Sequence, residues 1–116
     1  MSVKHTGDID GVVVMNATGV TRKTLISQQE APNFAMRVFT IQPGGEMPIH
    51  TNRVEHEQYV LNGHARICIG EDEFEVSKGS VVYIPADVPH WYKNIGDEQF
   101  EFLCMVPNKP DVITML

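Results

Sequence analysis

The sequence has little cysteine: its 116 residues include only Cys68 and Cys104, and neither belongs to a C-x-x-C pair. A structural zinc site or a dithiol redox motif is therefore unsupported. We expect both thiols to be reduced and buried, as free cysteines commonly are. A reactive thiol that lines a pocket is the alternative for Cys104.

Basic residues are also few, because nine Lys and Arg are spread singly against fifteen Asp and Glu, for a net charge of −6. Without a basic stripe to neutralise phosphates or anionic lipid, nucleic acid and membrane are poor candidates as partners. No apolar run approaches the roughly 20 residues of a spanning helix. The first residues, MSVKHTGDIDG, are acidic where a signal peptide would be apolar, so we expect a cytoplasmic protein.

Helical periodicity is hard to find, whereas short β-branched and aromatic runs end repeatedly at Gly, Pro, Asn or Asp. This pattern is typical of an all-β sandwich or barrel, and the length suits a single domain over residues 1–116. The first 20 or so residues are predicted to form an edge strand or an arm that reaches a neighbouring subunit. The expected strands are Arg22–Ser27, Phe34–Gln42, His56–Leu61, His64–Ile69, Glu73–Val76, Ser80–Ile84, His90–Asn94 and Glu98–Val106.

Two local patterns add to this prediction. The dipeptide Asn62-Gly63 lies between two strand-like runs, which is a strong signal for a two-residue hairpin. In the last expected strand the charged Glu101 should face water, so Leu103 and Met105 lie on the same outer face. We interpret that apolar outer face as the interface of a homodimer, with cover by a long N-terminal strand as the alternative. The alternation then directs inward Phe100, Phe102, Cys104 and Val106.

Three of the five histidines are placed to converge. His50 and Asn52 are two residues apart on an extended segment and so point to the same side, while His56 begins the next strand. His90 begins a strand far along the chain. Imidazole suits Fe, Mn, Ni, Cu and Zn, and a site rich in His but poor in thiolate disfavours Mg and Ca. The alternative is that these are three unrelated histidines that cap loops.

The residues around these histidines resemble the two signature motifs of the cupin superfamily. The first is Gly44-GEMPI-His50-Thr51-Asn52-RVEH-Glu57-QYVLN-Gly63, with two departures from the usual pattern. The second is Gly79-SVVYI-Pro85-Ala86-Asp87-Val88-Pro89-His90-WYK-Asn94, in which only the usual Gly is replaced, by Asp87. The resemblance spans roughly residues 30 to 107 and implies a jelly-roll barrel, the double-stranded β-helix of cupins.

The chain resembles small single-domain cupins that hold manganese or iron with four histidines. This resemblance implies one divalent transition metal ion, Mn or Fe before Ni, Cu or Zn, bound by His50, His56 and His90. Asn52 stands where the second histidine of that subgroup would be. Three roles are open for Asn52: a metal ligand, a residue that orients metal-bound water, or the mark of a lost ligand and little metal.

The third ligand and the pocket wall also have alternatives. His56 and Glu57 are adjacent on a strand and cannot both face inward. General cupins use the glutamate, whereas the subgroup resemblance favours His56. Phe102 and Cys104 are expected to form part of an apolar pocket wall. Arg37 either enters the barrel and holds an anionic substrate or, as is commoner for such a residue, forms a surface ion pair.

The function implied by this resemblance is a metal-dependent cupin with a small-molecule pocket. Oxygenase or dioxygenase chemistry is the first expectation, although cupin barrels carry many reactions. A binding or sensing module with a weakened metal site is a second hypothesis, which Asn52 favours. A metal-dependent isomerase or lyase is a third, which Arg37 inside the barrel would favour.

Overall fold

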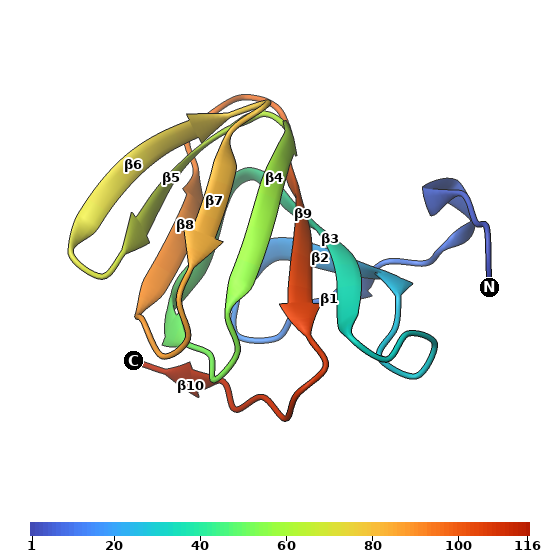
Figure 1. The fold of residues 1–116 in the computed structure, drawn as a ribbon. Coiled ribbons are helices and arrows are strands. Elements are labelled where there is room, and N and C mark those ends of the chain that lie inside the picture. Colours follow the sequence, from blue (N-terminus) through green and yellow to red (C-terminus); the bar gives the residue numbers. More distant parts are fainter.

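The computed structural model describes residues 1–116 and shows strands throughout, apart from one 3-10 turn at Thr6–Asp8. The strands curl into a barrel with β6, β5 and β8 on one side and β4, β7 and β9 on the other (Figure 1). The predicted all-β barrel is confirmed. The strands are β1 Val12–Val13, β2 Thr18–Ile26, β3 Phe34–Thr51, β4 His56–Asn62, β5 His64–Ile69, β6 Asp72–Ser77, β7 Val81–Ile84, β8 His90–Asn94, β9 Phe100–Pro107 and β10 Thr114–Met115.

Strand β3 belongs to both sides of the barrel. Its first half pairs with β2 and β9, and its second half pairs with β8. We expected this strand to end at Gln42, before Pro43-Gly44-Gly45, but the chain bends there and continues to Thr51. Gly44 permits the bend with a φ of +78°. At Gly45 a side chain would collide with the Thr18 carbonyl oxygen, 2.6 Å from the position of a Cβ.

The core follows the alternation that was predicted for β9. Phe100, Phe102 and Cys104 are at most 1% exposed, while Leu103 and Met105 between them are half-buried on the outer face. The inward side chains join one buried cluster with residues of β3, β4, β5 and β8. The homodimer that we inferred from the outer face stays a prediction.

The predicted hairpin at Asn62-Gly63 is wrong. Strand β4 pairs with β7 and β9, whereas β5 pairs with β6 and β8, so the dipeptide carries the chain from one side of the barrel to the other. Asn62 stays in the strand and donates a hydrogen bond from Nδ2 to the Gln99 carbonyl at 2.8 Å. Gly63 has a φ of +85° and lies directly against Gln99 and Phe100. Gly63 therefore allows the chain to pass close to Gln99 and Phe100 between β4 and β5, and it does not form a two-residue hairpin.

Both chain ends add strands beside the barrel. β1 pairs with β2, which puts this part of the N-terminal segment at the edge of the sheet. β10 pairs with the end of β3, where Met115 lies opposite His50, and Figure 1 shows it beneath the lower end of the barrel. None of the helical structure is long or apolar enough to cross a membrane.

The crossing at Gly63 yields a stability prediction. Gly63→Ala should lower the free energy of unfolding by about 3 kcal/mol, because it combines a strained positive φ with a collision against the backbone. A Cβ there would lie 2.9 Å from Phe100 Cα. Gly79→Ala is the matched control, since Gly79 has a φ of +93° but open space around it. Its loss should be about 1 kcal/mol, from strain alone. Urea unfolding measures both, and equal losses would contradict the crossing constraint.

Candidate functional site

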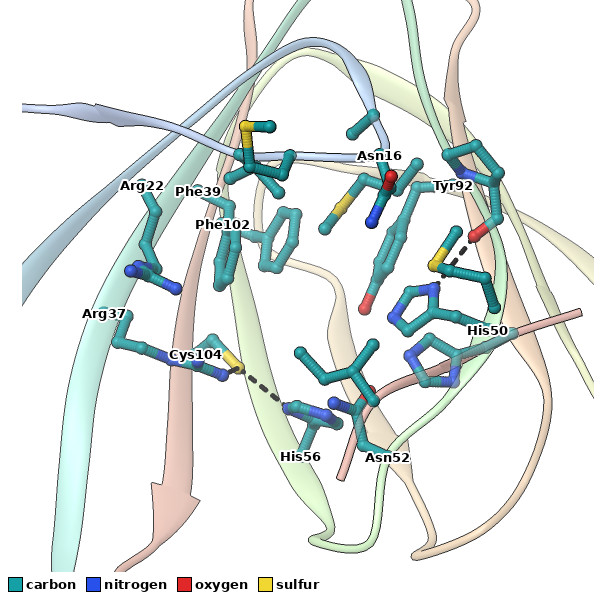
Figure 2. A pocket seen from close by; sticks show the side chains of 18 of the residues that line it. Asn16, Arg22, Arg37, Phe39, His50, Asn52, His56, Tyr92, Phe102 and Cys104 are labelled. Atoms are coloured by element: carbon teal, nitrogen blue, oxygen red, sulfur yellow. Dashed lines mark hydrogen bonds between the residues drawn. The ribbon is translucent and has the colours of Figure 1, made fainter. Parts of the chain in front are cut away.

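The barrel contains a pocket of about 440 Å³. Segments from both chain termini contribute to its lining, and Figure 2 shows its interior. All of the side chains that we singled out from the sequence as metal ligands or pocket wall line this one pocket: His50, Asn52, His56, His90, Arg37, Phe102 and Cys104.

The three histidines come from three strands that the fold brings together. His50 on β3 is the register partner of His90 on β8, and their ring centroids are 4.3 Å apart. His56 is the first residue of β4, and its ring centroid lies 5.7 Å from that of His90. All three side chains are buried, with 2% to 8% of each residue exposed.

Hydrogen bonds define which nitrogen of each imidazole is free. His50 Nδ1 lies 2.9 Å from the Pro48 carbonyl oxygen, and His90 Nδ1 lies 2.9 Å from the Val88 carbonyl oxygen. A carbonyl oxygen only accepts, so each Nδ1 carries the proton and each neutral ring keeps an unprotonated Nε2. This arrangement is the one usual for histidines that bind metal through Nε2.

His56 Nδ1 faces a thiol, which can donate or accept a hydrogen bond, so this contact does not fix the tautomer of the ring. Its Nδ1 lies 3.4 Å from Cys104 Sγ, and its Nε2 is buried with no hydrogen-bond partner. Burial, followed by the positive charge of Arg37, lowers the pKa of His56 to about 3. Burial also lowers the pKa of His90 to about 4, although the hydrogen bond to Val88 opposes it. Both rings are therefore neutral at physiological pH, the form in which imidazole binds metal.

The donor chemistry fits a transition metal ion. The pocket combines three imidazoles with amide side chains and has no carboxylate donor, a set that favours Mn, Fe, Ni, Cu or Zn over Mg or Ca. As the side chains stand, no three His, Cys, Asp or Glu residues are arranged to surround one ion. The rings would have to draw together to enclose a metal.

Asn52 is oriented by a residue of the C-terminal segment. Its Nδ2 donates to Asp111 Oδ2 at 2.9 Å, and the other Asp111 oxygen accepts a hydrogen bond from the Arg53 amide at 2.7 Å. Because a carboxylate only accepts, the amide nitrogen of Asn52 must face Asp111. The Asn52 Oδ1 atom is left buried and without a partner. This unpaired oxygen is available to a metal ion, a water molecule or a substrate.

Glu57, the alternative third ligand, does not line the pocket. It follows His56 on β4 and is half-buried on the opposite face of the strand. Burial, together with the neighbouring Glu55, raises the pKa of Glu57 to about 6. The strand register thus brings His56, and not Glu57, to the other histidines.

Arg37 is in the pocket and takes part in no ion pair, so the surface ion pair that we weighed for it is wrong. The three ion pairs of the structure join Lys4 to Glu30, Arg53 to Asp87 and Arg66 to Glu75. The Arg37 guanidinium lies over the Phe39 ring, 5.1 Å from its centroid, and its Nη2 donates to Cys104 Sγ at 3.6 Å.

Several pocket residues were not identified from the sequence. Gln58 follows His56 by two residues, so strand alternation could have placed it on the inner face, as it could have placed Phe39 after Arg37. Tyr92 follows His90 by two residues, so alternation could have placed it inward as well, and the structure puts it in the pocket. Arg22 carries no such signal. The terminal segments also carried no periodicity that pointed to the pocket, which they line with Val12–Ala17, Ile113 and Met115.

The Asp111 contacts predict how the C-terminal segment is held. Asp111→Ala removes both acceptors for Asn52 and Arg53, so residues 108–116 should detach and open the pocket more often. Amide hydrogen exchange of residues 113–116 should then quicken by about tenfold, because a lost pair of charged hydrogen bonds is worth more than 1 kcal/mol. Val112→Ala changes an exposed neighbour and serves as the control. If the amide hydrogen exchange of residues 113–116 is unchanged in Asp111→Ala, Asp111 does not hold the C-terminal segment in place.

Comparison with known proteins agrees with this fold. Residues 37–106, well over half of the chain, match the cupin-domain family Cupin_2. Among solved structures, the polyketide cyclase RemF from Streptomyces resistomycificus superposes with a TM-score of 0.90 at 28% identity, covering 100% of this chain and 85% of that one.

Two curated relatives are longer than the region that this chain matches. The 1-methylthio-D-xylulose 5-phosphate methylsulfurylase of Rhodospirillum rubrum is 29% identical over 92 residues, which are 79% of this chain and 58% of the relative. Oxalate decarboxylase OxdC of Bacillus subtilis is 33% identical over 75 residues, 60% of this chain and 20% of the relative. The chain thus spans only part of these relatives. The family match, together with the barrel that superposes on a cupin-sized structure over its whole length, shows that this chain belongs to the cupin family, as a Cupin_2 domain.

Proposed function

We propose that this cupin is a metal-dependent enzyme that stabilises the enolate of a small, largely apolar carbonyl compound, as an isomerase, lyase or cyclase does. The observation that carries the proposal is the arrangement of three buried imidazoles, each with Nδ1 engaged, around one apolar pocket. His50, His56 and His90 would hold the metal, with Asn52 Oδ1 as a fourth donor. When bound there, a divalent ion supplies Lewis-acid polarisation of a substrate oxygen.

Tyr92 is the chain's own hydrogen-bond donor toward such an oxygen. Gln58 Nε2 donates to the Tyr92 hydroxyl oxygen at 2.7 Å, which leaves the hydroxyl proton of Tyr92 free to point into the pocket. Burial raises the pKa of Tyr92 well above its usual value, so it stays a phenol at all physiological pH values. A donor fixed in this way stabilises negative charge that develops on a carbonyl oxygen.

The remaining pocket lining excludes water and provides a flat surface. The rings of Phe39 and Phe102 are stacked with centroids 5.3 Å apart, and those of Phe102 and Tyr92 with centroids 5.0 Å apart. Removing water strengthens the electrostatic interactions inside the pocket. The lining contains no Asp, Glu or Lys. The residues of this chain therefore stabilise an oxyanion better than they accept a proton.

The similar proteins support chemistry without oxidation. One solved structure that covers the whole chain is named as a polyketide cyclase, and a curated relative is named as a decarboxylase. Neither name is that of an oxygenase. The oxygenase expectation stays a prediction, and the pocket position of Arg37 favours the isomerase or lyase hypothesis that we tied to it.

Metal binding is the first prediction. Protein purified without a His-tag or chelator should contain about one transition metal ion per chain by elemental analysis. His56→Ala should lose it, because the variant lacks one of three imidazoles, whereas His64→Ala, an exposed site outside the pocket, should keep it. Asn52→His should bind the ion more tightly. A wild type without metal and an Asn52→His variant that also fails to bind would contradict the metal site.

Enolate stabilisation is the second prediction. Zn²⁺-loaded protein with phenylpyruvate in D₂O under argon should exchange the substrate's benzylic protons for deuterons, which proton NMR follows. A C–H bond loses its proton to solvent, and the enolate then takes up a deuteron at the same carbon. Tyr92→Phe should slow this exchange by about a hundredfold, as expected for loss of one oxyanion donor. Tyr83→Phe, on the exposed outer face, is the control and should not change it.

The oxygenase is the second candidate, and one observation favours it. Three imidazoles and one amide leave coordination positions free, on a pocket with an apolar wall, which suits the binding of an oxidant. The two candidates differ in their need for oxygen. Consumption of a substrate only when air is admitted, with no deuterium exchange under argon, would support the oxygenase and overturn enolate stabilisation.

A further inference from the structure

The pocket carries a concentration of positive charge that the histidine site does not use. Arg22 and Arg37 line it, and no Asp, Glu or Lys does. The chain as a whole has a net charge of −6, so the pocket differs in sign from the molecule around it. Neither arginine belongs to any of the three ion pairs.

The two arginines are neighbours on the inner face of the sheet. Arg22 on β2 is the register partner of Phe39 on β3, and Arg37 lies two residues before Phe39 on the same face. Burial first, and the charge of Arg37 second, lower the pKa of Arg22. Two guanidiniums therefore repel one another here without a compensating acid.

Both guanidiniums also have unsatisfied donors. The Nε atoms of Arg22 and Arg37 are buried and have no hydrogen-bond partner. Unpaired charges and unpaired buried donors both cost stability, so this arrangement is unfavourable for the protein alone. Pocket residues that lower the stability of the protein alone commonly serve to bind a ligand.

The geometry favours a planar anion. The Arg37 guanidinium lies over the Phe39 ring, and its one hydrogen bond, from Nη2 to Cys104 Sγ, leaves other N–H groups along the guanidinium edge for a ligand. Such an edge matches the two oxygens of a carboxylate. Beside it run the stacked rings of Phe39, Phe102 and Tyr92, which would contact a flat apolar body. Figure 2 shows Arg22 and Arg37 on one side of these rings and His50 on the other.

We propose that Arg22 and Arg37 form a carboxylate-binding subsite, so that the substrate is an aromatic or otherwise apolar carboxylic acid. Its carboxylate binds the two guanidiniums, its body lies along the aromatic rings, and its reacting carbonyl reaches Tyr92 and the histidines. This inference rests on the proposed function for the substrate's role, but the subsite itself needs neither metal nor turnover.

The test measures binding to metal-free protein. Phenylacetate and its neutral match phenylacetamide are titrated by NMR in the presence of a chelator, with inorganic phosphate as a third probe. Phenylacetate should bind about tenfold or more tightly than the amide, because it adds charged hydrogen bonds. Arg37→Met and Arg22→Met should each remove most of that preference. Arg66→Met is the control, since Arg66 pairs with Glu75 outside the pocket.

Thermal unfolding separates a binding role from a structural one. If the arginines serve the ligand, Arg37→Met should unfold at the same or a higher temperature than the wild type, because it removes like-charge repulsion and a buried unpaired donor. Arg37→Lys, which keeps the charge without the paired N–H groups, should bind phenylacetate weakly but fold normally.

Several results would overturn the subsite. Equal affinity for phenylacetate and phenylacetamide would do so, as would a preference that survives both methionine variants. Phosphate binding that depends on the arginines while phenylacetate fails would replace the carboxylate by a phosphate ester. Each of these outcomes is independent of deuterium exchange by the Zn²⁺-loaded protein, so failure of the subsite and failure of the proposed function are told apart.

Discussion

The pocket depends on the continuity of β3 through both halves of the barrel. One strand carries Arg37 and Phe39 before its bend and His50 after it, and Asn52 follows directly. Strand alternation alone would put His50 on the face opposite Arg37, and the register shift between Met47 and His50 turns both side chains into the pocket. A strand that ended at Gln42 would leave the arginine end and the histidine end of the pocket on independent elements, free to shift against one another.

Burial also sets the charge states of the residues that line the pocket. Burial keeps His56 and His90 neutral, keeps Tyr92 protonated and leaves Arg22 and Arg37 as the only charges in the lining. The protein as a whole is acidic, but the fixed positive charges in this low-dielectric cavity attract any anion that enters it. The pocket therefore combines imidazole nitrogens, cationic hydrogen-bond donors and stacked aromatic rings, and Cys104 lies between His56 and Arg37.

Much of this could be predicted from the sequence, because its strongest signals are local. Strand alternation placed Phe102 and Cys104 inward, and the motif spacing brought His50, His56 and His90 to one pocket. Asp87, which replaces the usual Gly of the second motif, has a φ of +65°, a conformation that glycine adopts readily. The hairpin at Asn62-Gly63 failed because a dipeptide that favours a turn does not tell which strands pair. Arg22 and Asp111 were missed because their roles come from contacts between segments far apart in the chain.

The histidine hydrogen bonds have a consequence for how the donor set tolerates motion. In both His50 and His90 the Nδ1 partner is the carbonyl of the residue two positions earlier, in the tripeptides Pro48-Ile49-His50 and Val88-Pro89-His90. Each ring is thus oriented by its own tripeptide and needs no partner from another strand. The distance between the strands can therefore change while the Nε2 atoms of His50 and His90 keep their direction. The orientation of each Nε2 donor is set by three consecutive residues. The distance between the donors is set by the whole fold.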